Sequence, residues 1–407
     1  MIGLTAEQTY LLHIMGCFLQ GQPLKALPEG DAFSWSTLLR EATEQTVVPI
    51  LFEVISEIQD KIPEDFYQKC FDYTRRCIVA NMRTEHAQRQ LVSVLEQEQY
   101  PYVILKGETA AACYPKPELR QLGDVDFLII PEQADSITEK MKALGYQHSW
   151  EPGDYHQVLE KPGACLEMHM DVAGMPEGNA REAVSEYLST IFEESCPMSR
   201  ESGTFAAPCD AHQALILLLH MQHHVLAKGM GLRHIMDWAC FVNETSQKAF
   251  WEERLLPLLR QIGLLHFTAV MTKMSSIYLH SHCPAWADNV DTNLCQLLME
   301  DILSGGNFGR KDQDRARSLS MLPNWETDER KEGKLKLLCR TLRYSALRHR
   351  PQYENKPICL FFSMCGRAIR YVCLYISGKR PNLLKAASHA DTRRNIYKQL
   401  HLFETEK

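Results

Sequence analysis

The segment from residue 99 to residue 172 interrupts a chain that is otherwise patterned for helices. Four runs in it have the length and composition of strands: Tyr102–Leu105, Val125–Ile130, Tyr155–Glu160 and Ala164–Asp171. The turn signal Lys161-Pro162-Gly163 predicts that the last two form a hairpin. A helix is expected at about 132–144. This segment must therefore fold as a compact α/β unit set between helical arms.

Helical periodicity dominates on both sides of this unit, and 407 residues exceed what one typical core holds. After the unit we expect helices at 180–193, 209–228, 231–244, 246–263, 265–281, 287–304, 331–349, 358–377 and 391–403. The predicted regions are an N-terminal helical region (1–98), the α/β core (99–172), a helical domain (173–305) and a basic C-terminal helical region (306–407).

The charge of the chain is unevenly distributed. The net charge is −7, from 44 basic and 51 acidic residues, which argues against a general nucleic-acid coat protein. Residues 310–407, however, hold 22 Lys and Arg against 10 Asp and Glu. Such an asymmetry indicates an anionic partner for the C-terminal region.

The cysteines and the apolar stretches predict a cytoplasmic protein. The 14 cysteines are scattered and form no C-x-x-C pair, which is typical of reduced thiols. The most apolar stretch, Ile358–Ile376, carries Arg367 and Arg370 at its centre. Each arginine would cost roughly 2.5–3.5 kcal/mol at the middle of a bilayer, so we expect no membrane span.

Two carboxylates open the second apolar strand, in the sequence GDVDFLII. Asp124 and Asp126 are two residues apart, and at the strand period of two they point to the same face. Two like charges repel unless a cation offsets them, which favours a divalent metal site. The repulsion also predicts that Asp126→Asn stabilises the metal-free protein. Spacing alone leaves a solvated strand start open.

A second acidic strand follows in the sequence LEMHMD. Glu167 and His169 share a face opposite the apolar residues. Placing Glu167 beside Asp124 and Asp126 gives three carboxylates around one or two Mg²⁺ or Mn²⁺ ions, an arrangement that suits phosphoryl or nucleotidyl transfer. His169 orients Glu167, lies near the acceptor, or is exposed on the strand.

The first predicted strand runs into a turn and a helix start at Lys106-Gly107-Glu108-Thr109. A glycine lets backbone N–H groups approach a phosphate closely, and a helix N-terminus favours anions. Lys106 offers a charge, Thr109 offers a hydroxyl, and Arg120 lies four residues before the acid pair. We therefore predict nucleotide contacts from Lys106, Gly107, Thr109 and Arg120.

These motifs together resemble the DNA polymerase β-type nucleotidyltransferase superfamily. VILKGETAAACYP, LRQLGDVDFLI and LEMHMDV are similar to an uncharacterised bacterial nucleotidyltransferase family that has an LKG turn, a YP and R segment, a GDxD strand and an ExH strand. That family's pattern continues into a helical stretch, here 220–238. The resemblance covers about residues 78–245.

The resemblance implies an α+β fold in which a small mixed-sheet nucleotidyltransferase core is embedded between N-terminal and C-terminal helical regions. Asp124 and Asp126 match the metal-binding acid pair, Glu167 the third acid and Gly107 the nucleotide-binding turn. The implied reaction moves an NMP from Mg-NTP to an acceptor and releases pyrophosphate. The superfamily's usual small residue after the turn glycine is Glu108 here, an anion that disfavours a triphosphate unless it points away.

Two other functions stay open on the sequence. One is a nucleotide-binding or regulatory protein on the same fold that transfers nothing, and the other is a nucleic-acid-handling protein that uses the basic C-terminal region. We also hypothesise that Arg343, Arg367 or Arg370 closes over the active cleft, against the alternative of a solvated basic face. The acceptor class is open among a small molecule, a polysaccharide precursor, a protein and RNA.

Two pairs with helical spacing follow the α/β unit. His220 and His224 are four residues apart, a spacing that can hold zinc, but they lack an H-E-x-x-H motif and a nearby Cys. We therefore expect them to have a structural or solvent-lining role. Arg233 and Asp237 have the same spacing, which predicts a salt pair within one helix, with a place in the cleft facing the α/β unit as the alternative.

Overall fold

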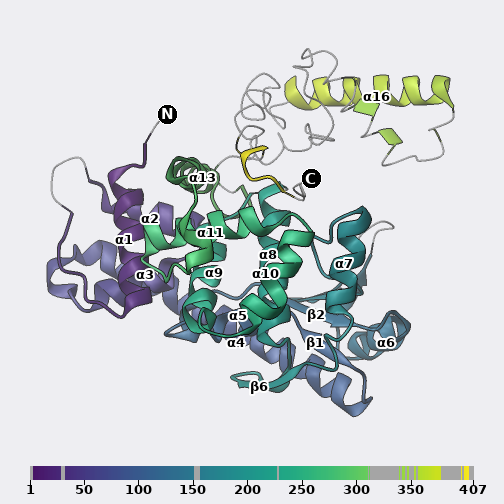
Figure 1. Ribbon diagram of the computed structural model, residues 1–407, viewed down its shortest axis with the longest axis horizontal. Helices are drawn as coiled ribbons and strands as arrows, with labels where there is room; N and C mark the ends of the chain where they lie inside the picture. Colours follow the sequence, from purple (N-terminus) through teal and green to yellow (C-terminus); the bar gives the residue numbers. More distant parts are fainter. Residues whose placement is uncertain are drawn as a thin grey trace.

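A computed structural model describes most of the chain up to residue 311 and parts of the remainder (Figure 1). The described residues are 3–28, 33–150, 156–226, 229–309, 311, 339, 342–343, 346–347, 353, 356–376, 396 and 398–402. The helices expected at 331–349 and 391–403 lie largely outside them. The predicted α+β fold is confirmed, because one mixed sheet is embedded among helices.

The sheet has five strands in the order β1-β2-β5-β4-β3. Strand β1 (Tyr102–Ile104) pairs antiparallel with β2 (Val125–Ile129), and β2 pairs parallel with β5 (Ala164–His169). Strand β4 (His156–Lys161) pairs antiparallel with β5, so the predicted hairpin is present, and β3 (Gln147–Ser149) pairs antiparallel with β4. Strand β2 is buried along its whole length, which explains its continuous apolar run.

Helix α4 (Glu64–Gln97) packs against β2 and β5, and α6 (Ala134–Ala143) packs against β3. The other helices before and within the α/β unit are α1 (Ala6–Gln20), α2 (Trp35–Glu44), α3 (Val48–Ser56) and α5 (Glu108–Ala111). The side chain of Thr5 caps α1 by accepting a hydrogen bond from the backbone N–H of Gln8. Leu91 and Leu95 of α4 share an apolar core with Phe127 of β2. The long helix α4 therefore supports the strand that carries the acid pair.

The remaining helices of the main body are α7 (Gly178–Leu188), α8 (Asp210–Leu226), α9 (Leu232–Thr245), a π-helical turn (Trp251–Leu255), α10 (Leu256–Gln261), α11 (Leu265–Leu279), α12 (Ala285–Asp288) and α13 (Thr292–Gly305). They share one apolar core with α1–α3 and with Val103 and Leu128 of the sheet. Trp238 is fully buried there and donates its indole N–H to Thr272 at 3.0 Å. This core holds α8 and α9 in place beside the sheet.

The expectation of helices alone after residue 180 is wrong for one short segment. Strands β6 (Cys196–Arg200) and β7 (Gly203–Ala207) form an antiparallel hairpin. Strand β6 is largely exposed and lacks the apolar alternation that predicts a strand. Phe205 and Ala207 of β7 nevertheless bury themselves in the core of the sheet. Tertiary packing therefore decides this hairpin.

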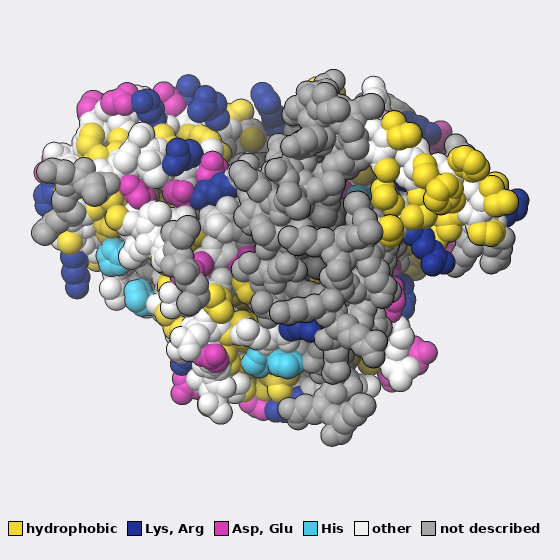
Figure 2. Space-filling model, turned by 90° about the horizontal axis from the view of Figure 1, so that it is seen from above, with side chains coloured by type: hydrophobic (Ala, Val, Ile, Leu, Met, Phe, Trp, Pro, Cys, Tyr) yellow, Lys and Arg dark blue, Asp and Glu magenta, His cyan; other side chains and the backbone are white. Residues whose placement is uncertain are grey.

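Helix α16 (Pro357–Ile376) exposes large apolar side chains. Ile358 is 72% exposed, and Phe361, Phe362 and Ile369 are exposed as well. Figure 2 shows hydrophobic side chains gathered at this end of the molecule. None of the described helices combines the length and the apolar character that crossing a membrane requires.

Candidate active site

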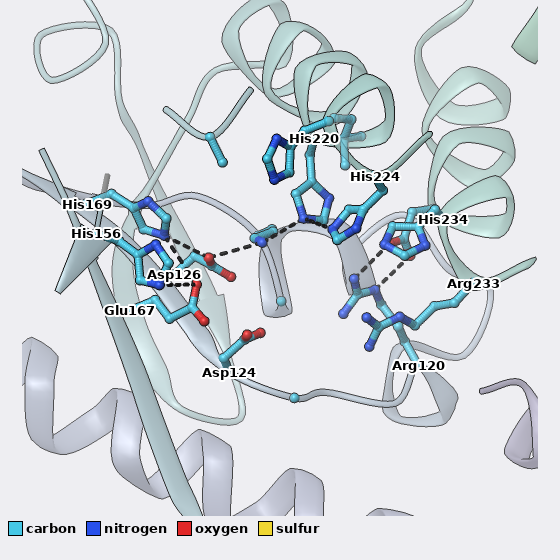
Figure 3. A pocket seen from close by; sticks show the side chains of 17 residues that line it. Arg120, Asp124, Asp126, His156, Glu167, His169, His220, His224, Arg233 and His234 are labelled. Atoms are coloured by element: carbon cyan, nitrogen blue, oxygen red, sulfur yellow. Dashed lines mark hydrogen bonds and ion pairs between the residues drawn. The ribbon is translucent and has the colours of Figure 1, made fainter. Parts of the chain in front are cut away.

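A cavity of about 400 Å³ lies between strands β2, β5 and β4 of the sheet and helices α8 and α9. This volume falls in the range of small-molecule sites, about 300–1,000 Å³. Figure 3 shows Asp124, Asp126 and Glu167 on one side of the cavity together with His156 and His169, and His220, His224, His234, Arg233 and Arg120 on the other. The lining residues are Lys106, Gly107, Arg120, Gly123, Asp124, Asp126, His156, Glu167, His169, Ala173, Leu217, His220, His223, His224, Arg233, His234 and Asp237.

The three acids singled out in the sequence converge on this cavity. Asp126 on β2 is the register partner of Glu167 on β5, so parallel pairing puts the two side chains next to each other. An oxygen of each and a ring nitrogen of His169 all lie within 4.8 Å of one another. Asp124, immediately before β2, lines the same cavity. The structure therefore brings Asp124, Asp126 and Glu167 together.

Lys106 offsets the charge of the buried member of the acid pair. Its Nζ lies 3.0 Å from Oδ1 of Asp126, whose side chain is only 1% exposed, and Nε2 of His169 donates to the same oxygen at 2.9 Å. Burial would raise the pKa of Asp126, but the Lys106 charge and the His169 hydrogen bond hold it below its usual value. The expectation that Asp126→Asn is stabilising took only the repulsion into account; because Asp126 also binds Lys106 and His169, we now expect the substitution to be destabilising.

Of the two aspartates in the pair, Asp124 is the one whose ionised form the repulsion disfavours. Repulsion from Asp126, together with burial, raises the pKa of Asp124 to about 6, although the Lys106 charge opposes the shift. One lysine is therefore too little positive charge for the acids around it. A cation bound beside Asp124 would lower this pKa and keep the carboxylate ionised.

Two histidines of the β4–β5 hairpin flank Glu167. Nε2 of His169 lies 3.7 Å from Oε2 of Glu167, and Nε2 of His156 lies 3.8 Å from the same oxygen. Burial opposes protonation of His169, but its hydrogen bonds to Asp126 and Glu167 raise its pKa. His169 is fully buried, which excludes the alternative of an exposed strand histidine. It connects two of the three acids.

The turn after β1 has the conformation that requires glycine. Gly107 has a φ of +90° and lines the cavity with its backbone. Glu108 is buried and points to other partners, because it accepts hydrogen bonds from the amide of Gln88 at 2.7 Å and from the hydroxyl of Ser202. Burial raises the pKa of Glu108, although the Ser202 hydrogen bonds oppose this. The side chain therefore does not line the cavity that a nucleotide would enter.

Two of the predicted nucleotide contacts have other partners. The Thr109 hydroxyl donates to the backbone oxygen of Leu105 at 3.2 Å, and Thr109 does not line the cavity. Arg120 does line it, but its Nε and Nη2 each donate to Asp237 at 2.7 Å. The hydroxyl of Tyr114 donates to the same carboxylate at 2.6 Å. Arg120 thus joins the loop before β2 to helix α9.

The predicted salt pair between Arg233 and Asp237 is not formed. Asp237 binds Arg120 in a bidentate geometry instead, and such a fork is stronger than a single contact along a helix. Arg233 donates from Nη1 to the backbone oxygen of Gln121 at 3.0 Å. The spacing within α9 could not predict that Asp237 pairs with Arg120 in place of Arg233, because Arg120 lies on a segment far from α9 in the sequence.

Histidines from α8 and α9 form the wall opposite the acids (Figure 3). Nζ of Lys106 lies 2.9 Å from Nε2 of His220, and Nε2 of His224 lies 2.8 Å from the same atom. Because an ammonium group only donates, Nε2 of His220 is the acceptor of the Lys106 hydrogen bond. Burial and the Lys106 charge keep the pKa of His220 well below its usual value, so this ring is neutral. Both histidines line the cavity, one of the two roles expected for them.

His234 and Arg233 complete this wall. A place in the cleft was one of the two roles open for Arg233, whereas sequence reasoning gave no role to His234, which lies in the stretch Gly231–Trp238 of the family resemblance. Their approach to the acids depends on how α9 packs against the α/β unit.

The C-terminal arginines do not supply cations to this cavity in the described part of the chain. Arg343 is exposed, Arg367 is partly buried, and neither lines the cavity. The side chain of Arg370 lies outside the described residues. The cations that line the cavity are Lys106 from the end of β1, Arg120 from the following loop and Arg233 from α9.

The acid cluster fits a divalent cation. Oδ1 of Asp126 accepts from Lys106 and His169, whereas Oδ2 is buried and has no hydrogen-bond partner among the described residues. A buried oxygen without a donor, beside an acid of raised pKa, indicates a missing positive charge. Carboxylate oxygens are the ligands that Mg²⁺ and Mn²⁺ prefer. The residues present therefore suit such an ion.

Comparison with known proteins agrees with the motifs. The model of a family described as "Uncharacterised nucleotidyltransferase" matches residues 31–280, which is more than half of the chain. The match confirms the resemblance and extends it into the N-terminal helices and beyond α9. No curated protein and no solved structure matches the chain.

Proposed function

The chain belongs to the uncharacterised nucleotidyltransferase family, and we propose that it transfers an NMP from a metal-bound NTP to an acceptor. In this reaction an acceptor oxygen forms a bond to the α-phosphorus, the bond between the α-phosphorus and the bridging oxygen breaks, and pyrophosphate leaves. The observation that carries the proposal is the convergence of Asp124, Asp126 and Glu167 at one end of the cavity, with one buried carboxylate oxygen lacking a donor.

Asp124, Asp126 and Glu167 would hold Mg²⁺ or Mn²⁺ in this proposal. When bound, the ion neutralises phosphate charge and polarises the reacting phosphorus. Asp126 stays ionised because Lys106 and His169 both bind it, so it is always available as a ligand. Asp124 depends on the cation itself, since its pKa is raised to about 6. Metal binding is therefore expected to release a proton at pH values below about 6.

Glu167 is the acid best placed to take the proton of the acceptor. General-base catalysis needs a carboxylate that an incoming hydroxyl can reach. The side chain of Glu167 is 23% exposed, whereas that of Asp126 is 1% exposed and held by two donors. His156 and His169 lie at each side of Glu167 and orient it.

Lys106 and Gly107 are the nucleotide contacts that the geometry supports best. Gly107 has a positive φ and no Cβ, so its backbone is accessible from the cavity. The ammonium group of Lys106 lies between the acids and the imidazole wall. Thr109 and Arg120 instead hold the turn and helix α9. Because Glu108 is bound by Gln88 and Ser202, it does not oppose a phosphate at this turn.

Label transfer tests the proposal and identifies the acceptor class. The protein is incubated with each of the four α-labelled NTPs, Mg²⁺ and a cell lysate, and the labelled product is sized. We expect Mg²⁺-dependent transfer of label by the wild type and none by Glu167→Gln. NTP binding without any transfer under these conditions would instead favour a nucleotide-binding protein that has lost activity.

A further inference from the structure

Arg233 is a cation of the cavity wall without a carboxylate of its own. Its neighbour Arg120 is fully paired with Asp237, but Arg233 forms no ion pair among the described residues and donates only to the backbone oxygen of Gln121. The Nε atom of Arg233 is buried and has no hydrogen-bond partner among the residues that the structure describes. The guanidinium group of Arg233 therefore has an N–H donor and a positive charge that a bound anion could satisfy.

The charge around Arg233 favours an anion over a cation at this end of the cavity. Burial and the nearby Arg120 lower the pKa of Arg233, which means that its charge is unfavourable as the protein stands. The ligand nitrogens of His220, His224 and His234 lie within 4.8 Å of one another, as in a metal site. A metal ion there would add positive charge beside Lys106 and Arg233, whereas an anion would neutralise them.

The position of Arg233 relative to the acids suggests which anion it receives. Arg233 and the acid cluster line one cavity from opposite sides, and Figure 3 shows Arg233 reaching from α9 toward it. A nucleotide whose α-phosphate lies at the acids must place its β- and γ-phosphates in the rest of this cavity. An arginine fork binds two phosphate oxygens at once and stays charged throughout.

We propose that Arg233, next to the neutral imidazole wall, binds the β- and γ-phosphates of the NTP and then the pyrophosphate that leaves. The inference rests on the proposed function, since it takes the acids as the site of the α-phosphate. His220, His224 and His234 bring polar contacts to this subsite without adding further charge, because burial keeps their rings neutral. Arg233 thus makes polyphosphate, rather than the base or the sugar, the part of the substrate that this wall recognises.

Equilibrium binding to Arg233→Gln tests the inference. The probes are Mg²⁺ with non-hydrolysable analogues of the four NTPs, Mg²⁺ with inorganic pyrophosphate, and the corresponding NMPs. We expect the variant to bind triphosphate and pyrophosphate about ten- to a hundred-fold more weakly than the wild type, because it loses a charged, forked contact. NMP affinity should change less than about three-fold. Arg181→Gln, which removes an equal charge from an exposed pair with Asp171, is the matched control and should bind like the wild type.

Thermal unfolding separates a binding role from a structural one. Because Arg233 has no carboxylate partner, Arg233→Gln should keep or raise the melting temperature, and Arg233→Lys should recover part of the lost affinity. If the wild type binds Mg-NTP and Arg233→Gln binds it equally well, the inference is wrong while the proposed function stands. A melting temperature that falls together with an equal loss of NMP binding would also overturn it. A wild type that binds pyrophosphate but no nucleotide would refute the proposed function and not the anion subsite.

Discussion

The ammonium nitrogen of Lys106 lies 3.0 Å from Oδ1 of Asp126 and 2.9 Å from Nε2 of His220, so one lysine joins the acid side of the cavity to the imidazole side. Burial alone would lower the pKa of Lys106, but the charges of Asp126, Asp124 and Glu167 together raise it and keep the amine protonated. The cavity therefore already contains one cation where the acids are densest. The energetics of the site depend on this pair.

Asp126→Asn should destabilise the protein as well as abolish transfer. The substitution removes the carboxylate that binds Lys106 and His169 directly, a loss expected to lower the free energy of unfolding by about 2–4 kcal/mol. Chemical denaturation of the metal-free protein measures this. Adding Lys106→Met to Asp126→Asn removes the ammonium charge and should restore part of the stability. If the single variant were as stable as the wild type, Lys106 would not depend on Asp126.

Asp124→Asn should stabilise the metal-free protein in a pH-dependent manner. The folded pKa of about 6 lies above the unfolded value, so between about pH 4 and 6 the folded state binds more protons than the unfolded state. The wild type therefore loses stability as the pH rises through this window, by at most about 3 kcal/mol for a shift of this size. The Asn variant lacks that loss. The difference in melting temperature between Asp124→Asn and the wild type should therefore grow as the pH is raised from 4 to 8. A difference that stays constant over this range would contradict the repulsion between the two acids.

Mg²⁺ should raise the melting temperature of the wild type because it binds the folded site. At a hundred times its dissociation constant an ion adds about 2.7 kcal/mol of stability. Glu167→Gln and Asp126→Asn remove a carboxylate from the cluster, so the shift should shrink strongly in both. Asp171→Asn is a suitable control, because Asp171 pairs with Arg181 and does not line the cavity. Equal shifts in all four proteins would place the metal elsewhere.

Arg120→Gln should be among the most destabilising single changes in the site. It leaves the Asp237 carboxylate buried with only the Tyr114 hydroxyl as a donor, at an expected cost of about 3–5 kcal/mol. Burial would raise the pKa of Asp237, but Arg120 lowers it, so this stability is present above the unfolded pKa and is lost as the pH falls through the folded pKa. The wild type should therefore lose more stability than Arg120→Gln on acidification below about pH 4. A small change on denaturation at neutral pH would show that the pair is dispensable.

The part of the site that local sequence could predict is the part built from neighbouring strands. The strand period and the apolar runs of β2 and β5 predict the side on which Asp124, Asp126 and Glu167 lie. These two strands pair directly with each other, so a single parallel pairing is enough to bring the three acids together. Lys106 and His220, by contrast, are 114 residues apart, and their contact depends on how α8 packs against the sheet. No local pattern contains that information.

The errors in the predicted fold have the same origin. Strand β3 and strand β6 are short and exposed, so they carry no apolar alternation, and only pairing with a neighbour makes them strands. The spacing of Arg233 and Asp237 favoured a pair within one helix, but Arg120, 117 residues away from Asp237, offers a bidentate partner. Tertiary contacts overruled local preference in each case.

Transfer from NTPs labelled at the α- or the γ-phosphate, with wild type and Asp124→Asn in parallel, tests the central claim most directly. We expect that α-label moves to the acceptor, that γ-label appears only in pyrophosphate, and that both signals require Mg²⁺ and fall by at least about a hundred-fold in the variant. Transfer of γ-label to the acceptor, or α-label transfer that survives Asp124→Asn unchanged, would contradict it.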